Sequence, residues 1–440
     1  MGDALAGALP WLDARLAMAI LIQFQGLLGI ALLLLIARLF ARQEPVSVPV
    51  PWRFVAGALA MQFILALLIV RVPLVWDLVG LANSAVSAVE RATLKGSSYM
   101  FGYLGGAPVP FPLKPGEAPP LIIAFQILPL IIVFSALTAL LWHWRVLQLA
   151  VRGLSWALRR TLGVSGVVGL AGGASLFLGV VESPLLLRAW FDRISRAELF
   201  AIMVLSMSGI SGALLILYAQ TVRAVVPDAV GHMISASLIS IPAALLLARL
   251  MHPGESATEA DVAQVDLRYE GSMDAVVRGT MDGVQLFLAV IGIIIVIFAL
   301  VALADDALSL LPNIASEPLT LKRIFGWIFA PIMWTIGVPW QEAPAAGALM
   351  GTKAILNEYV AFLEMAAIPP GTLGPRATLI VTYALCGVAN LASIGLLVST
   401  IGTLAPSRRA DAAALGVRSW IAGNAATLMT GAVIGIVTLP

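Results

Sequence analysis

The chain has 440 residues, of which 60% are hydrophobic and only 11% are charged, with a formal net charge of +2. Soluble domains carry roughly 25% charged residues, so this composition excludes an ordinary soluble protein and predicts an integral membrane protein. The basic residues are scattered rather than clustered, which predicts no nucleic-acid partner. The single Cys386 excludes a disulfide framework within the chain, and the three histidines lack metal-ligand spacing.

Eight apolar runs approach the roughly 20 residues that a helix needs to cross a bilayer. They are 17–37, 54–70, 120–142, 199–219, 229–248, 284–304, 378–404 and 417–438. Two further apolar regions, 164–190 and 326–366, are interrupted by Gly, Pro and charged residues. Broken backbone is tolerated at membrane depth where protein surrounds it, so these regions predict re-entrant hairpins. The expected fold is all-α, with about eight transmembrane helices and two re-entrant hairpins.

Arginine placement predicts the orientation of these spans. The segments 38–53, 143–162 and 405–418 each carry more arginines than acids, which places them on the cytoplasmic side. With eight spans, both termini then lie outside a bacterial-type inner (plasma) membrane. The loop 249–283 is rich in acids but also contains arginines, and we assign it to the cytoplasm because acids contribute little to the rule.

Two stretches, 73–96 and 144–160, place apolar residues at helical spacing with charge on one side. Such helices lie in the membrane interface or pack as connecting helices on the bundle, and the pattern does not choose between these.

The order of hairpin, broken span and span occurs twice, and the assigned orientation makes the two copies inverted. Inverted repeats with discontinuous helices place a substrate site near the bilayer midplane, at the interface between the repeats. We expect five parts. The first three are an N-terminal scaffold of membrane helices and an interfacial helix (1–118), a third span with an interfacial helix (119–163) and the first repeat (164–255). An acidic loop with the sixth span (256–318) and the second repeat (319–440) follow.

Two carboxylates lie inside hydrophobic stretches, where an ionisable group is expensive and indicates a functional site. Glu182 lies in LFLGVVESPLLL, after Gly179 and before Pro184, so it is expected at the hairpin tip near the N-terminus of a new helix. The alternative is a helix cap in an interfacial loop. Glu358 follows Asn357 in the second hairpin, and a structural ion pair with Lys353 is the alternative there.

The broken spans carry further polar groups. Asn390 and Ser393 are three residues apart in an otherwise apolar span, so they share a helix face and could bind the hydroxyls of a polar substrate. They could instead form polar contacts between helices. The matching span of the first copy contains Ser206, Ser208, Gly209, Ser211 and Gly212, which predict an unwinding point or close helix packing. No ATP-binding loop or catalytic grouping is evident, so the chain is not expected to be an enzyme, and transport would use an ion gradient.

Several motifs in 120–438 resemble the concentrative nucleoside transporter family in their order and spacing. They include LFLGVVESPLLLR (176–188), IGVPWQEA (336–343), LMGTKAILNEYVAF (349–362), LCGVANLASIGLL (385–397) and GVRSWIAGNAATLMTGAVIG (416–435). The resemblance implies a homotrimer in the lipid bilayer. Each protomer would combine a scaffold with a mobile transport part that moves in an elevator-like manner.

The resemblance also implies the roles of individual residues. Glu358, Asn390 and Ser393 match the family's ribose-binding positions, and Asn357 is grouped with them. The nucleobase would lie near the first hairpin tip, where Glu182 matches the family. Val180 and Val181 stand where the family has polar residues, so the base side of the site is altered.

The resemblance further implies a cation site that departs from the sodium-coupled members. Ser175 and Gly209 stand where those members have an Asn and a Ser, and the backbone carbonyls would come from Leu178 and Ile210. Sodium prefers oxygen ligands, so the loss of an amide and a hydroxyl oxygen weakens a sodium site. Coupling to H⁺, through Glu182, is the alternative to Na⁺, and no other cofactor is expected.

The sequence therefore predicts a secondary active transporter that imports nucleosides or nucleoside-like polar solutes, coupled to a H⁺ or Na⁺ gradient. A transporter of a different polar solute and a non-transporting membrane scaffold or gate module are the alternatives.

Overall fold

A computed structural model describes residues 14–41, 51–112, 120–180, 182–254, 258–259, 268–314 and 317–438. For residues 14–22, 73–83, 182 and 293 it describes the backbone alone. Within these ranges the regular secondary structure is helical, apart from one isolated bridge between Ile314 and Glu317. The all-α prediction therefore holds for the described residues.

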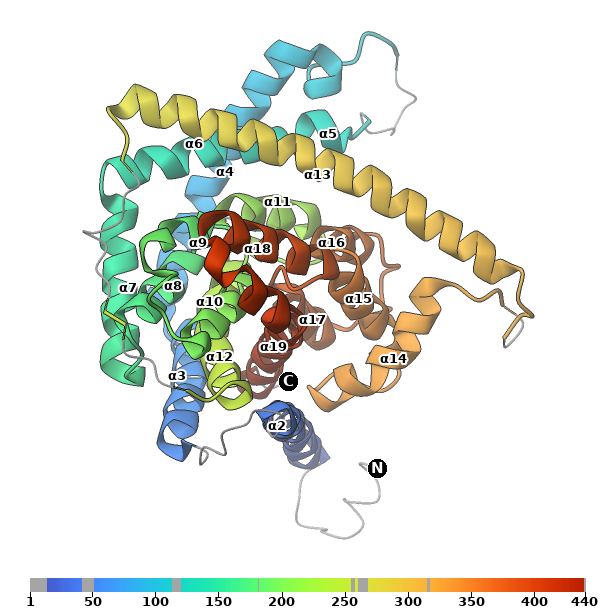
Figure 1. The fold of residues 1–440 in the computed structure, drawn as a ribbon. Helices are drawn as coiled ribbons and strands as arrows, with labels where there is room; N and C mark the ends of the chain where they lie inside the picture. Colours follow the sequence, from blue (N-terminus) through green and yellow to red (C-terminus); the bar gives the residue numbers. More distant parts are fainter. Residues whose placement is uncertain are drawn as a thin grey trace.

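The helices follow the predicted apolar runs closely (Figure 1). In chain order they are α2 (Ala14–Ala41), α3 (Trp52–Arg71), α4 (Pro73–Phe101), η1 (Gly102–Gly105), α5 (Ile123–Gln126), α6 (Pro129–His143), α7 (Val146–Leu162), α8 (Gly166–Ser175), α9 (Glu182–Leu186), η2 (Arg188–Trp190), α10 (Arg196–Ser208), α11 (Gly212–Val222), α12 (Ala229–Met251), α13 (Ser272–Ser309), α14 (Leu321–Thr335), α15 (Ala343–Ile355), α16 (Glu358–Ala366), α17 (Pro375–Leu385), α18 (Leu391–Leu404), η4 (Pro406–Arg408) and α19 (Arg409–Val437).

Seven stretches of the described chain are long and apolar enough to cross a membrane. They correspond to seven of the eight predicted spans. The eighth, 378–404, is divided into α17 and α18, neither of which is long enough alone. The span predicted at 199–219 is also divided, into α10 and α11, at the serine- and glycine-rich segment that predicted an unwinding point.

The first predicted hairpin, 164–190, contains α8, the short α9 and η2. The prediction for the second hairpin was too wide. Region 326–366 contains part of α14 as well as α15 and α16, so the hairpin comprises only the last two helices. The chain reverses between α14 and α15 at Gly337, whose φ of +111° favours glycine, and Pro339 then prevents α14 from continuing.

With this correction, the order of elements in the two copies agrees more fully than predicted. In the first copy α7 precedes the hairpin and packs on α8, and in the second α14 precedes the hairpin and packs on α15. The predicted amphipathic stretch 144–160 is α7, and its apolar side lies on the hairpin, with Val151 and Leu158 buried. The stretch 73–96 is part of α4, where only the backbone is described up to residue 83.

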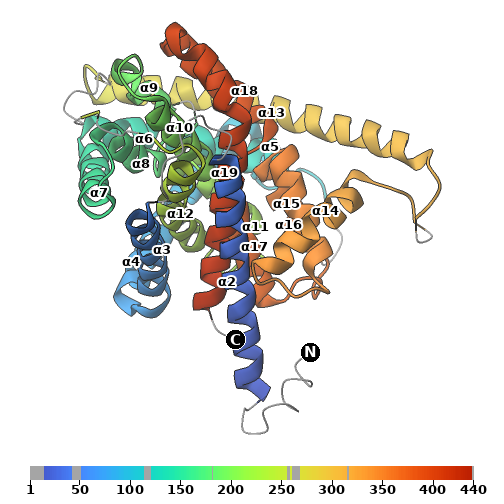
Figure 2. The same ribbon diagram turned by 60° about the horizontal axis from the view of Figure 1, so that its bottom comes forward.

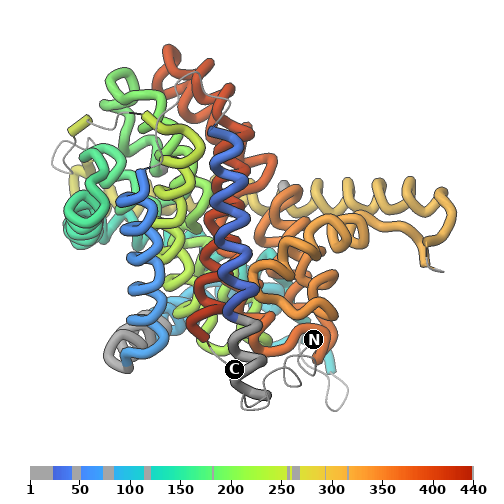
Figure 3. Tube along the Cα trace, turned by 90° about the horizontal axis from the view of Figure 1, so that it is seen from below, coloured from blue at the N-terminus to red at the C-terminus, as the bar shows by residue number. Residues whose placement is uncertain are grey.

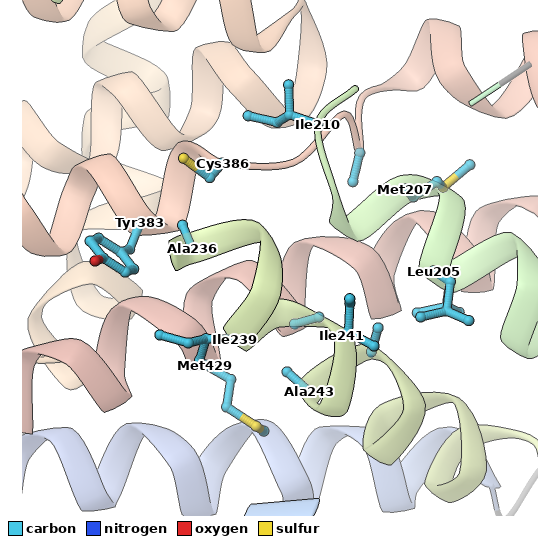
Figure 4. Packing of buried hydrophobic residues seen from close by; sticks show 14 of the residues in the cluster. Leu205, Met207, Ile210, Ala236, Ile239, Ile241, Ala243, Tyr383, Cys386 and Met429 are labelled. Carbon is cyan, nitrogen blue, oxygen red and sulfur yellow. The ribbon is translucent and has the colours of Figure 1, made fainter. Parts of the chain in front are cut away.

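The core of the molecule is formed by α12 and α19, with α10 and α17 each packed on both of them, and other helices surround these four (Figures 1 and 2). Figure 4 shows how buried side chains of α10, α12, α17 and α19 interdigitate, including Leu205, Ile239, Tyr383 and Met429. Outside this core, α2 runs beside α19 and α3 beside α12 (Figure 3).

The long helix α13 lies along α6 and projects beyond the rest of the chain (Figures 1 and 2). The two helices approach closely because Gly279 and Gly283 face α6. A Cβ on Gly283 would lie 2.7 Å from the Ile132 Cα atom. Much of the outer surface of α13 is apolar and exposed, as at Leu288, Ile295 and Leu303. The pair forms a layer distinct from the α10–α12–α17–α19 core.

Candidate functional site

The two broken spans cross at their unwound segments. Helix α10 ends at Ser208, and Gly209 continues in an extended conformation before α11 starts at Gly212. In the second copy α17 ends at Leu385 and α18 starts after Asn390. The Val388 amide donates to the Gly209 carbonyl over 3.3 Å, which links one break directly to the other. Four half-helix ends therefore meet in the interior of the bundle.

Polar side chains from neighbouring elements satisfy backbone groups at this crossing. The Ser240 hydroxyl of α12 donates to the Ser208 carbonyl over 3.0 Å, and the Asn424 amide of α19 donates to the Ala389 carbonyl over 2.9 Å. The Asn390 side-chain oxygen accepts from the Ser393 backbone amide over 2.9 Å and so caps α18. Unpaired backbone groups are costly at membrane depth, so these side chains stabilise the broken geometry.

Glu358 lies beside the crossing, at the start of α16, and is only 3% exposed. Its Oε1 atom accepts a hydrogen bond from the Tyr218 hydroxyl over 2.7 Å, and its Oε2 atom accepts from the Asn390 side-chain amide over 2.9 Å. Hydrogen bonds to an ionised acceptor are roughly twice as strong as neutral ones. The carboxylate thus joins α16 to α11 and to the N-terminal end of α18, elements of both copies.

Three of the predicted residues therefore lie together in this cluster. Glu358 contacts Asn390, and the buried Ser393 donates its backbone amide to the Asn390 side chain. Asn357 also lies here, but its side-chain oxygen accepts from the Tyr359 amide over 2.7 Å and caps α16. The alternative of an ion pair between Lys353 and Glu358 does not hold as a direct contact within 4.0 Å, because both carboxylate oxygens accept from other donors. The two side chains interact only at longer range.

Sequence reasoning missed Tyr218. It is 2% exposed, and its ring stacks on Tyr359 with the centroids 5.5 Å apart. The sequence does indicate that this tyrosine is unusual, because its hydroxyl lies inside the apolar sequence LLILYA and a buried hydroxyl usually finds a hydrogen-bond partner. That signal could not identify Glu358 as the partner, since 140 residues separate the two.

The family resemblance implies that Glu358 binds the substrate, so Tyr218→Phe is expected to weaken nucleoside affinity by about 10-fold. Loss of a hydrogen bond to a charged group costs about 1.5–3 kcal/mol, and water can replace part of it. The ring stack on Tyr359 is retained, so the fold should be unaffected. Isothermal titration calorimetry of the purified protein with nucleosides measures the change. The matched control is Tyr359→Phe, which removes a hydroxyl from the same stack but neither hydrogen bond to Glu358. Equal affinities of the two variants would contradict the role of the Tyr218 hydroxyl.

The first hairpin presents its tip to a cavity of about 210 Å³ between the hairpin and the α6–α13 layer. Leu178 and Gly179 line it together with Ser211 from the first break and Asp282 from α13. Val180 is half-buried and packs against the core. Val181 lies outside the described residues, as does the side chain of Glu182.

The backbone of Glu182 is described and starts α9, as predicted from the Glu-Ser-Pro sequence. Helix α9 contacts α18, the helix that follows the second break. The functional roles predicted for the tip residues stay predictions.

The residues of the predicted cation site are brought together. A Cβ on Gly209 would lie 3.1 Å from the Ser175 carbonyl oxygen, and the Gly212 amide donates to the Phe177 carbonyl over 3.3 Å. The end of α8, with Leu178 just beyond it, therefore lies against the first break, where Ile210 is completely buried.

The oxygens available at this place suit a hard cation, but they are few. The Ser175 hydroxyl donates to the Gly172 carbonyl and leaves its oxygen lone pairs available, whereas Gly209 offers only its carbonyl, which also accepts from Val388. Among the described residues no group of three His, Cys, Asp or Glu side chains could hold a metal ion. A bound ion would therefore depend on backbone carbonyls and on serine hydroxyls such as those of Ser175 and Ser208.

Comparison with known proteins shows which family this chain belongs to. Family models described as "Na+ dependent nucleoside transporter N-terminus", "Nucleoside recognition" and "Na+ dependent nucleoside transporter C-terminus" match residues 28–104, 124–225 and 232–435. An uncharacterized transporter of Haemophilus influenzae is 35% identical over 93% of this chain and 96% of its own length. The putative nucleoside permease NupX of Escherichia coli is 30% identical over 93% of this chain and 98% of its own length.

The chain belongs to the concentrative nucleoside transporter family. This confirms the resemblance, and a place in a family of cation-coupled transporters confirms that the chain is not an enzyme. Its fold is similar to that of CNTnw in an inward-facing substrate-bound state, with a TM-score of 0.81, 33% identity and coverage of 94% of this chain and 98% of the other. The predicted fold class, a multi-pass helical membrane protein of this transporter type, is thereby confirmed.

Proposed function

We propose that this transporter carries a nucleoside across the membrane and that Glu358, Asn390 and Ser393 hold the ribose, with Asn357 fixing the start of α16. The observation that carries this proposal is the Glu358 carboxylate, held by Tyr218 and Asn390 at the crossing of the two broken spans. A carboxylate and an amide side by side can bind the two neighbouring hydroxyls of a ribose. Family membership supports a nucleoside as the substrate class.

The nucleobase would lie toward the first hairpin tip, among Gly179, Val180, Val181 and Glu182. The half-buried Val180, which packs against apolar neighbours, supports an apolar surface for the base there. A hydrophobic pocket discriminates poorly between solutes of similar shape. We therefore expect broad base selectivity, and uptake of a different nucleoside-like solute is the second candidate function.

The coupling cation would bind where the end of α8 meets the first break, at Ser175, Leu178, Gly209 and Ile210. Sodium coupling is supported by the family, whose models are named for it. The absence of a side-chain oxygen at Gly209 favours weak sodium binding, and H⁺ uptake by Glu182 is the alternative.

We further propose an elevator motion of the core and hairpins against the α6–α13 layer, in a homotrimer with both termini outside. Solved CNTnw structures in outward-facing and inward-facing states support alternating access. The exposed apolar surface of α13 supports its burial by lipid or by a neighbouring protomer.

Uptake of labelled nucleosides into proteoliposomes tests the proposal, with Na⁺ and H⁺ gradients imposed separately. We expect concentrative uptake under one of them, with several nucleosides competing. A panel with free nucleobases and sugars separates nucleoside transport from transport of another polar solute. Absence of uptake of every nucleoside under both gradients would contradict the proposal, and would favour a non-transporting scaffold or gate module.

A further inference from the structure

Lys353 places its side-chain amino group inside the bundle. It lies in the last turn of α15, and its side chain is completely buried. Its ammonium donates to the Thr427 hydroxyl oxygen over 2.8 Å and to the Ala384 carbonyl oxygen over 3.3 Å. No salt bridge within 4.0 Å joins it to a carboxylate in the described chain, and Glu358 attracts it only from a longer distance. A buried charge without a paired counter-charge is expensive, so its retention requires a specific environment.

The C-terminal end of α17 provides that environment. Ala384 lies in the last turn of this half-helix, which ends at Leu385 before the break. Carbonyls in a last turn lack intrahelical donors and carry the negative end of the helix dipole. The Thr427 hydroxyl donates its own proton to the Asn424 carbonyl over 3.0 Å, so its oxygen is oriented to accept from Lys353. A carbonyl and a hydroxyl oxygen at a half-helix end are ligands for a small cation.

The first copy has the same construction without a lysine. There α8 ends at Ser175, with its carbonyl against Gly209 at the first break, and the last four residues of α8 are Gly172, Gly173, Ala174 and Ser175. In both copies, the last turn of the hairpin's first helix thus meets the break in the following span. The proposed exchangeable cation lies at this place in the first copy, and the Lys353 ammonium occupies the corresponding place in the second.

We infer that Lys353 is a tethered cation, whose ammonium form fills the second copy's counterpart of the cation site. It neutralises the end of α17 and so fixes the break that holds Asn390 against Glu358. It also confines exchangeable cations to the first copy. This inference rests on the proposed function, which supplies the exchangeable cation of the first copy.

The test is the melting temperature of the purified, nucleoside-free protein in choline chloride, compared with NaCl and LiCl at equal ionic strength. Lys353→Met should melt about 5–10 °C lower in choline than the parent, because the α17 carbonyl and Thr427 lose their cation. Na⁺ or Li⁺ should restore at least half of this loss by binding in the vacated place. Lys322→Met, which removes an exposed lysine of α14, should respond to the salts as the parent does. A lower melting temperature that neither cation restores would overturn the inference.

A second pair of variants decides the question if Lys353→Met does not fold. Thr427→Val removes one acceptor of the ammonium, whereas Thr430→Val removes an equally buried hydroxyl of α19 that donates to the Ala426 carbonyl. Thr427→Val should melt several degrees lower than Thr430→Val. Equal melting temperatures would overturn the inference. None of these measurements requires transport, so absence of nucleoside uptake contradicts the proposed function without affecting this result.

Discussion

Glu358→Gln is expected to reduce nucleoside uptake by about 10- to 150-fold, because hydrogen bonds to a charged group contribute about 1.5–3 kcal/mol. Tyr218 and Asn390 both donate to the carboxylate. A glutamine has the same shape but no charge, so Tyr218 and Asn390 would lose their charged acceptor, and its amide group would donate where the carboxylate accepts. Initial uptake rates in proteoliposomes, together with affinities from calorimetry, measure the effect.

Glu364→Gln is the matched control for this experiment. Glu364 lies on the same helix α16, but its carboxylate accepts from Thr352 over 3.2 Å and pairs with Lys322, away from the crossing. It should transport at a rate close to that of the parent. If Glu358→Gln transports as well as Glu364→Gln, the carboxylate does not bind the substrate and the proposed ribose site is wrong.

Gly387→Ala is expected to lower the melting temperature by about 2–10 °C and to reduce uptake, because overpacking a closely packed site costs about 1–3 kcal/mol. A Cβ at this position would lie 2.6 Å from the Thr427 Cγ2 atom and 3.1 Å from the Ser208 carbonyl oxygen. The carbonyl belongs to the end of α10 and cannot move without opening the crossing of the two breaks. Thermal denaturation followed by circular dichroism measures the loss.

Gly395→Ala gives the comparison for this variant. Gly395 lies a few residues further along, within α18, and a Cβ there would meet no atom within 4 Å. Since alanine is the better helix former by about 1 kcal/mol, this variant should melt at the parent's temperature or slightly above it. Equal destabilisation by the two substitutions would show that close approach at Gly387 is not what the crossing requires.

Much of the fold could be predicted from local sequence. Long apolar runs, such as those that form α3, α12 and α19, predict their spans because every backbone group of a helix is satisfied within the segment itself. The break between α10 and α11 was also predictable, because serine and glycine cluster there. The extent of the second hairpin was predicted wrongly, since α14 is apolar enough to resemble part of it.

Part of the candidate site could also be predicted from local sequence. Glu358, Asn390 and Ser393 stood out as polar residues in apolar sequence, and the structure brings them together. The partners of the carboxylate could not be chosen from sequence. Lys353, five residues away, was the available candidate, yet Tyr218 of the other copy holds the carboxylate, and Lys353 is directed to α17 and α19.

The sequence by itself determined that this protein is a helical membrane protein with two interrupted hairpins, two broken spans and a few costly polar groups inside them. These properties follow from the composition and periodicity of continuous segments, because the bilayer penalises each unsatisfied polar group separately. Only the tertiary structure decided which polar groups satisfy one another. Those pairings join α11 to α16, α15 to α19 and one break to the other, and such contacts depend on how distant segments pack.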